Sequence, residues 1–125
     1  MKLQITTAAL ALVMTASVAT AADLIAVNTP SGQVVAAADT GLTLYTFRKD
    51  SRDTSNCYNS CAQSWPPFLA EAGATAKGGL DLIERRDGTQ QWAMGGKPLY
   101  FWAGDEARGD VTGDGVGGVW DAVRQ

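Results

Sequence analysis

The Gly- and Asp-rich stretch near the C-terminus, DVTGDGVGGVWD, has the residue types of a cation site. It partly matches the calcium loop of EF-hands, with Gly115 at the turn position and oxygen-bearing side chains at ligand positions: Asp110, Thr112, Asp114 and Asp121. Thr112 at position 3 of the twelve-residue loop and Asp121 at position 12 depart from the pattern, which has an Asp or Asn and a Glu there. The stretch therefore predicts either a divalent-cation (calcium) site or a cluster of Gly/Asp turns without a metal.

A second candidate is the pair Cys57 and Cys61, which is the complete set of cysteines in the sequence. An even number of cysteines in an exported chain favours a disulfide, which would fix the loop before Trp65. The alternative is a thiol redox pair. However, the spacing is not C-x-x-C, and no Lys or His lies beside either cysteine to lower a thiol pKa.

A third candidate is a motif that occurs twice, as LYTFRKD at 44–50 and LYFWAGD at 99–105. An aspartate that follows a strand can accept hydrogen bonds from loop N–H groups, which is a structural role for Asp50 and Asp105. Alternatively, two carboxylates facing one cleft could act as a glycosidase-like acid/base pair. The sequence has no His, which excludes Ser-His-Asp and Cys-His catalysis, His-ligated metals and c-type haem attachment. We therefore expect a protein that is not an enzyme.

The repeated motif belongs to a longer internal repeat with a constant offset of 55 residues. The matched positions are Gly41/Gly96, Leu44/Leu99, Tyr45/Tyr100, Phe47/Trp102, Asp50/Asp105 and Trp65/Trp120. Two copies are too few for a solenoid, so the repeat predicts one pseudo-symmetric domain.

Each copy reads as a meander of short strands separated by Gly-rich turns. Strands are expected at 24–28, 33–38 and 42–47, then at 80–85, 90–94 and 98–102, with closing strands from Trp65 and Trp120 and one helical turn within 56–63. Side chains alternate along a strand, so Tyr45 and Phe47 share a face opposite Leu44. This predicts a central strand buried on both faces, or an exposed aromatic face that stacks on a sugar, lipid or quinone ring. The expected fold is a small all-β sandwich or barrel-like domain of two pseudo-symmetric three-to-four-stranded meanders with long loops.

The N-terminal residues have the pattern of a cleaved secretory signal. Lys2 precedes an apolar run at 5–18, and Ala19-Thr20-Ala21 supplies a small-x-small cleavage site. The run is too short and too rich in Ala and Thr to span a membrane well. We expect a signal peptide at 1–21 and a single domain at 22–125, with repeat one at about 24–70 and repeat two at about 80–125.

These motifs together resemble a family of bacterial secreted repeats, often described as predicted lipoproteins of unknown function. The resemblance rests on the paired Y-x-[FWY]-x-x-D motifs and on matching segments: GLTLY at 41–45, Cys57, Cys61, WPP at 65–67, QW at 91–92, GKPLY at 96–100 and GDVTGDG at 109–115 with GVW at 118–120. It implies an exported envelope or extracellular domain and transfers no activity or cofactor. The chain lacks the lipobox Cys of lipid-anchored proteins.

The leading functional hypothesis is an exported, non-enzymatic binding or structural module of the envelope or medium, soluble after signal cleavage. Its partner would be an envelope component or a small ligand that the sequence does not identify. The net charge of −3 and the lack of a basic cluster argue against nucleic acid, and no membrane span or cofactor other than calcium is expected. Calcium binding and thiol redox activity are the alternatives.

Overall fold

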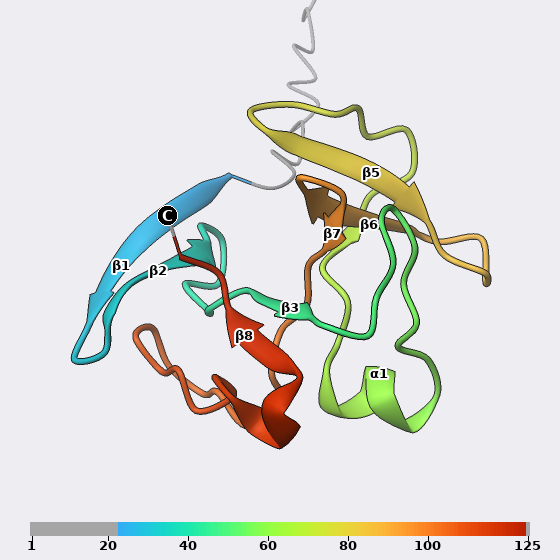
Figure 1. Cartoon of the computed structure of the whole chain (residues 1–125). Helices are drawn as coiled ribbons and strands as arrows, with labels where there is room; N and C mark the ends of the chain where they lie inside the picture. The colour runs from blue at the N-terminus through green and yellow to red at the C-terminus, as the bar shows by residue number, and fades with distance from the viewer. Residues whose placement is uncertain (1–22, 125) are drawn as a thin grey trace, which may run out of the picture.

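The regular elements of the computed structural model, which describes residues 23–124, are mostly short antiparallel strands joined by long loops (Figure 1). The predicted signal peptide at 1–21 lies outside the described residues. The elements in chain order are β1 (Leu24–Thr29), β2 (Gly32–Ala37), β3 (Tyr45–Phe47), α1 (Ser60–Ser64), β4 (Leu69–Ala70), β5 (Leu80–Glu84), β6 (Gln90–Met94), β7 (Lys97–Pro98), the 3₁₀ turn η1 (Val116–Gly118) and β8 (Trp120–Ala122). The strands form small sheets, and none of those described closes into a barrel. The expected all-β class is confirmed.

Each repeat begins with a hairpin, as the turn residues predict. β1 pairs with β2, with Val27 opposite Val34, and β5 pairs with β6, with Ile83 opposite Gln91. Gly88 in the second hairpin turn has a φ of 85°, a conformation that favours glycine over residues with a Cβ. The two hairpins lie on opposite sides of the central strand β3 (Figure 1).

The third strand of each meander is shorter than the sequence suggests. The predicted strand at 42–47 is reduced to β3, and the one at 98–102 is reduced to β7 and isolated bridges at Tyr100. The reason is that each segment pairs with two different segments, one along each of its edges. Tyr45 exchanges both backbone hydrogen bonds with Tyr100, at 2.8 and 2.9 Å, and on its other edge it faces Ala122. Tyr45 and Tyr100 therefore lie beside the pseudo-two-fold axis that relates the repeats.

The closing strand of each repeat pairs with the other repeat. β8 of repeat two pairs with β3 of repeat one, so that Ala122 lies opposite Tyr45. Fifty-five residues earlier, Pro67 of repeat one lies opposite Tyr100 of repeat two, and β4 continues this pairing along β6. The sequence predicts these strands but not their exchange between the repeats.

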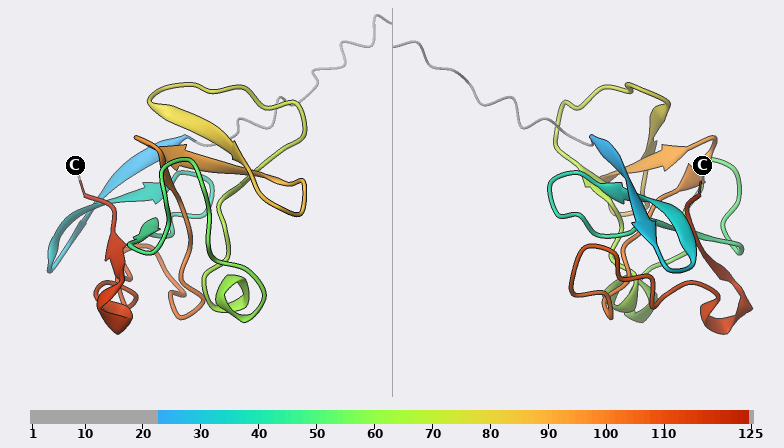
Figure 2. Two further views of the ribbon diagram at one scale, coloured as in Figure 1. Left: turned by 45° about the vertical axis from the view of Figure 1, so that its right-hand side comes forward. Right: turned by 90° about the vertical axis from the view of Figure 1, so that its left-hand side faces the viewer.

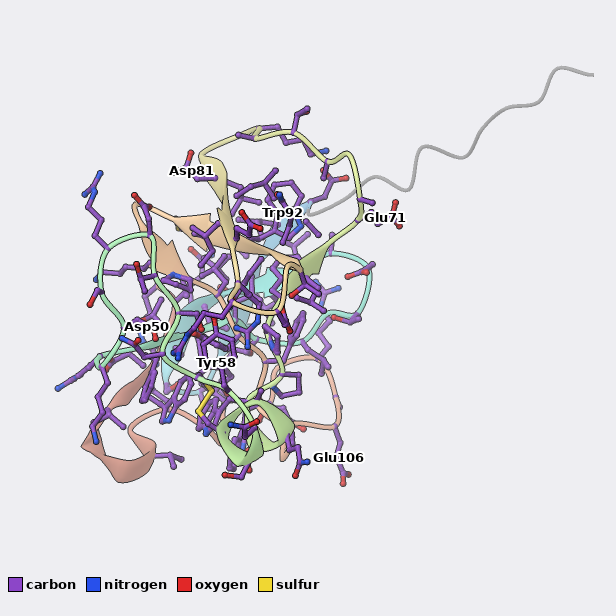
Figure 3. The ribbon with its side chains drawn as sticks, turned by 90° about the vertical axis from the view of Figure 1, so that its right-hand side faces the viewer. Asp50, Tyr58, Glu71, Asp81, Trp92 and Glu106 are labelled. Atoms are coloured by element: carbon purple, nitrogen blue, oxygen red, sulfur yellow. A yellow bond between two sulfur atoms is a disulfide. The ribbon has the colours of Figure 1, made fainter. Side chains whose placement is uncertain are left out.

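The alternation of side chains along β3 separates two hydrophobic cores. The first core contains the motif rings, including Tyr45, Tyr100, Trp65 and Trp120, and the second contains Leu44, Leu99 and Trp92 among others. Figure 3 labels Trp92 in the second core, close to β5 and β6. The central strand is thus buried on both faces, as predicted.

Two loop-borne turns, α1 and η1, lie at the same end of the molecule in all the ribbon views (Figure 2). They occupy corresponding positions in the repeats, because α1 at Ser60–Ser64 precedes Trp65 and η1 at Val116–Gly118 precedes Trp120. The predicted helical turn near the cysteines is therefore present. Within residues 23–124, no helix has the length and apolar character needed to cross a membrane.

Candidate functional site

The two motif tyrosines and the two motif aspartates are hydrogen-bonded across the repeats. The Tyr45 hydroxyl donates to Oδ2 of Asp105 at 2.5 Å. The Tyr100 hydroxyl donates to Oδ2 of Asp50 at 2.7 Å. Each tyrosine therefore reaches the aspartate of the other copy, because the two central segments lie side by side.

The second oxygen of each aspartate holds the loop of its own repeat. Oδ1 of Asp50 accepts the backbone N–H of Asn56 at 2.7 Å. Oδ1 of Asp105 accepts the N–H of Thr112 at 3.0 Å and the Thr112 hydroxyl at 2.6 Å. Burial raises the pKa of Asp50 above its ordinary value, and burial is also the main cause of the raised pKa of both tyrosine hydroxyls. The tyrosines therefore stay protonated donors.

The aromatic residues of the motif form a continuous stack between the repeats. Trp65 and Trp120 lie face to face, with ring centroids 3.8 Å apart and planes inclined by 4°. Phe47 stacks on the outer face of Trp120 and Trp102 packs on Trp65, each with centroids 4.2 Å apart. Together with the two Tyr–Asp pairs, this stack brings every residue of the paired motif into one cluster.

A buried polar group beside Tyr100 has no counterpart beside Tyr45. Arg85, of which 4% is exposed, donates to the Ser55 hydroxyl at 2.9 Å, the Gln91 side-chain oxygen at 2.8 Å and the Cys57 carbonyl at 2.7 Å. The Ser55 hydroxyl is in turn 2.6 Å from that of Tyr100. Our sequence analysis missed Arg85, although a usable signal exists. The only signal is that Arg85 follows Ile83 by two residues, so the two side chains share a face of the extended strand, and Ile83 is buried.

Cys57 and Cys61 form a disulfide, with an S–S distance of 2.02 Å. Cys57 is fully buried in the first core, and Cys61 packs against that core from α1. The disulfide thus pins the loop that leads to Trp65. In Figure 3 it appears as a yellow bond next to α1, below Tyr58.

The aspartates of the predicted calcium loop are directed to separate partners. Asp110 accepts the N–H groups of Glu106 and Ala107, which lowers its pKa. Asp114 accepts the Ala122 N–H and pairs with Arg124 at 3.0 Å. Asp121 pairs with Arg48 at 2.8 Å.

In the part of the chain that the structure describes, no group of three or more His, Cys, Asp or Glu is placed to hold a metal. The hydroxyl of Thr112, in the same loop, donates a hydrogen bond to Asp105. Calcium binding at this loop stays a prediction, and it would require Asp114 and Asp121 to leave their arginine partners. Calorimetric titration with calcium, together with melting in the presence and absence of a chelator, tests it.

A groove of about 440 Å³ lies next to this cluster, between β3 and the turn that joins β6 to β7, and we call it the β3–β7 groove. Its charged lining consists of Arg48, Asp50, Arg52, Lys97 and Asp121. A second hollow of about 320 Å³ shares Thr46, Lys97 and Asp121 with it and continues to Arg124. Sequence analysis did not find this groove, because its cations come from separate segments that only the fold brings together.

Fold and site together define a duplicated all-β module, in which two copies exchange closing strands around a shared Tyr–Asp and aromatic cluster. A family model described as a secreted repeat of unknown function (Lipoprotein_15) matches residues 25–68 and again residues 81–124. The chain belongs to this family, which confirms the resemblance seen in the sequence. Searches of curated proteins and of solved structures find no match to the chain.

Proposed function

We propose that the protein is an exported, non-enzymatic binding module that holds a small anionic ligand in the β3–β7 groove. The observation that carries this proposal is the charge of the lining. Arg48, Arg52 and Lys97 face the groove together with two aspartates, and Arg48 already neutralises Asp121 through two hydrogen bonds of 2.8 Å. A local cationic surface on a chain with a net charge of −3 attracts anions selectively.

Two of the groove cations are available to a ligand. Among the ion pairs of residues 23–124, Lys97 has no partner, and Arg52 approaches a carboxylate only at 4.0 Å, from its neighbour Asp53. The Arg52 side chain is 83% exposed, so this contact is weak. A bound anion would gain two charge-assisted hydrogen bonds and would displace at most the weak contact between Arg52 and Asp53.

The other repeat provides an internal comparison. At an offset of 55 residues, Arg48 corresponds to Ala103 and Arg52 to Ala107, while Asp121 corresponds to Pro66. The backbone is nevertheless equivalent, since the N–H of Arg48 donates to Val119 and that of Ala103 donates to Ser64, both at 2.8 Å. The fold therefore does not require these charges, whereas it uses Tyr, Asp and Trp in both copies. These charges are therefore free to serve binding.

A role without catalysis is supported by the state of the candidate reactive groups. The sequence contains no His, and the Ser55 hydroxyl lies in a residue that is only 2% exposed. Asp50 and Asp105 each accept a tyrosine hydroxyl and a loop N–H, so both act as anchors. Export is supported by the secreted family and by the predicted signal at 1–21.

The test is an anion titration of residues 22–125 followed by NMR, with inorganic phosphate and succinate as probes. We expect amide shifts around the groove and a loss of affinity of at least tenfold in R52Q/K97Q, because each cation contributes a charge-assisted contact. The matched control K49Q/R108Q removes two exposed cations outside the groove and should change affinity less than about twofold. Equal losses in both variants, or no shifts at the groove with either probe, would overturn the proposal.

A further inference from the structure

We infer that the ligand of the β3–β7 groove is an acidic saccharide, that is, a sugar chain bearing carboxylates. This inference rests on the proposed function and names the class of anion. The groove combines three chemistries: the cations Arg52 and Lys97, the carboxylates Asp50 and Asp121, and the ring of Phe47. An acidic sugar offers a complement to each of them, namely a carboxylate, hydroxyl donors and an apolar C–H face.

Phe47 presents an aromatic surface to the groove because it ends the ring stack. One face packs on Trp120, with planes inclined by 12°, while the half-buried ring also lines the groove. An aromatic ring that is packed on one side is a rigid platform for the C–H face of a sugar.

At the opposite end of the stack, Trp102 is half-buried like Phe47, but backbone packs closely against it. A Cβ at Gly104 would lie 2.5 Å from its Nε1, and one at Gly113 would lie 2.8 Å from its Cγ. The surroundings of the stack thus differ at its two ends. The cations lie at the end formed by Phe47, which reaches the groove.

The two aspartates of the lining distinguish a sugar from a simple phosphate. Each Asp50 oxygen accepts one hydrogen bond from the protein, and each Asp121 oxygen accepts one from Arg48. A carboxylate oxygen has a second lone pair, so both side chains can also accept sugar hydroxyls. A polyphosphate has few hydroxyls to donate and brings a high density of negative charge toward Asp50 and Asp121, whereas an acidic sugar offers several hydroxyl donors with one carboxylate per unit.

The combined volume of the groove and the second hollow suits more than one sugar unit. The hollow of about 440 Å³ falls in the range of small-molecule sites. Lys97 also lines the second hollow, of about 320 Å³, which continues to Arg124. Arg52 and Lys97 line the first hollow, and Lys97 and Arg124 line the second, where Arg124 is paired with Asp114. Cations in both hollows suit an oligosaccharide whose carboxylates recur along the chain.

The experiment compares three probes on residues 22–125 by calorimetry and NMR: a short oligogalacturonate, its neutral methyl ester, and inorganic tripolyphosphate. We expect the oligogalacturonate to bind at least tenfold more tightly than either of the others. K97Q should weaken the oligogalacturonate and leave the methyl ester unchanged. F47L, which keeps an apolar side chain against Trp120, should weaken both saccharides about fivefold and leave tripolyphosphate unchanged.

The outcomes separate the two proposals. Tighter binding of tripolyphosphate than of oligogalacturonate would overturn the saccharide inference and leave the anion-binding proposal standing. Equal binding of the acid and its methyl ester would overturn the inference of an acidic saccharide and would leave the anion-binding proposal to its own probes, phosphate and succinate. If none of these probes, and neither phosphate nor succinate, shifts a groove amide, both proposals fail. A melting measurement on F47L and K97Q separates loss of binding from loss of folding.

Discussion

The crossed hydrogen bonds predict which tyrosine and aspartate are energetically coupled. Y45F removes a hydroxyl that donates to Asp105 at 2.5 Å and accepts the Gly113 N–H at 3.2 Å. Tyr45 is fully buried and Asp105 is only 7% exposed, so water cannot replace the lost group. A hydrogen bond to a charged group contributes about 1.5–3 kcal/mol, and the unsatisfied buried N–H costs about 1 kcal/mol more. We therefore expect Y45F to lower the free energy of unfolding by about 3 kcal/mol.

A pair of double-mutant cycles tests the crossing itself. Combining Y45F with D105N should give a coupling free energy of about 2 kcal/mol, because both changes affect one hydrogen bond. Combining Y45F with D50N joins residues of the same motif copy, and their coupling should stay below about 0.5 kcal/mol. Asp50 is the matched control, because it occupies the corresponding motif position but accepts the hydroxyl of Tyr100.

The assay is equilibrium urea unfolding of residues 22–125, followed by tryptophan fluorescence and by circular dichroism. Coincidence of the two transitions establishes two-state behaviour, and an unchanged slope shows that each variant unfolds from a native-like state. A larger coupling between Tyr45 and Asp50 than between Tyr45 and Asp105 would refute the exchange of hydrogen bonds between the repeats.

The remaining predictions concern the disulfide, one glycine and one pKa. C57A/C61A opens a loop of very few residues and should cost about 2 kcal/mol in urea unfolding; an unchanged midpoint would contradict a stabilising role. Gly96 has a φ of 81°, and its added Cβ would lie 2.9 Å from Arg52, so G96A should destabilise the protein by about 1–2 kcal/mol and weaken anion binding. The same change at Gly88, which has a φ of 85°, lies outside the groove lining and has nothing within 4 Å of its added Cβ, should leave binding unaltered. The pKa of Asp50 is raised in the folded state, so the folded protein binds the proton more tightly. The free energy of unfolding should therefore rise as the pH falls from above this raised pKa toward the ordinary value of about 4. D50N should lose this rise in urea unfolding. If the free energy of unfolding of D50N changes with pH in the same way as that of the unmodified protein, the prediction is contradicted.

The repeat and the strand faces could be predicted because they depend on local patterns. A constant offset and the alternation of Leu44, Tyr45 and Phe47 place the strands and both cores, since side chains alternate on any extended segment. The exchange of closing strands could not be predicted in this way. WPP at 65–67 can pair with a strand of either copy, and only the assembled backbone, with Tyr45 against Tyr100, decides between them.

The groove escaped prediction for a related reason. Its lining comes from β3, the following loop, the β6–β7 turn and β8, so Arg52, Lys97 and Asp121 are distant in sequence. No periodicity connects them. The comparison of corresponding positions, such as Arg48 with Ala103, was already available in the sequence, but its meaning becomes clear only when the backbone around both positions is seen to be the same.

The exchange of closing strands also bears on how such a chain could arise. A single copy would leave its central segment without a partner on one edge and its own closing strand unpaired, and it would have a tyrosine without an acceptor. Two identical copies would satisfy all of these needs at once through a self-complementary two-fold interface. The present chain has the geometry of a homodimer whose subunits have been fused. After fusion, the two halves no longer need to have the same sequence. One half could therefore acquire the arginines of a groove while the other kept alanines at the corresponding positions.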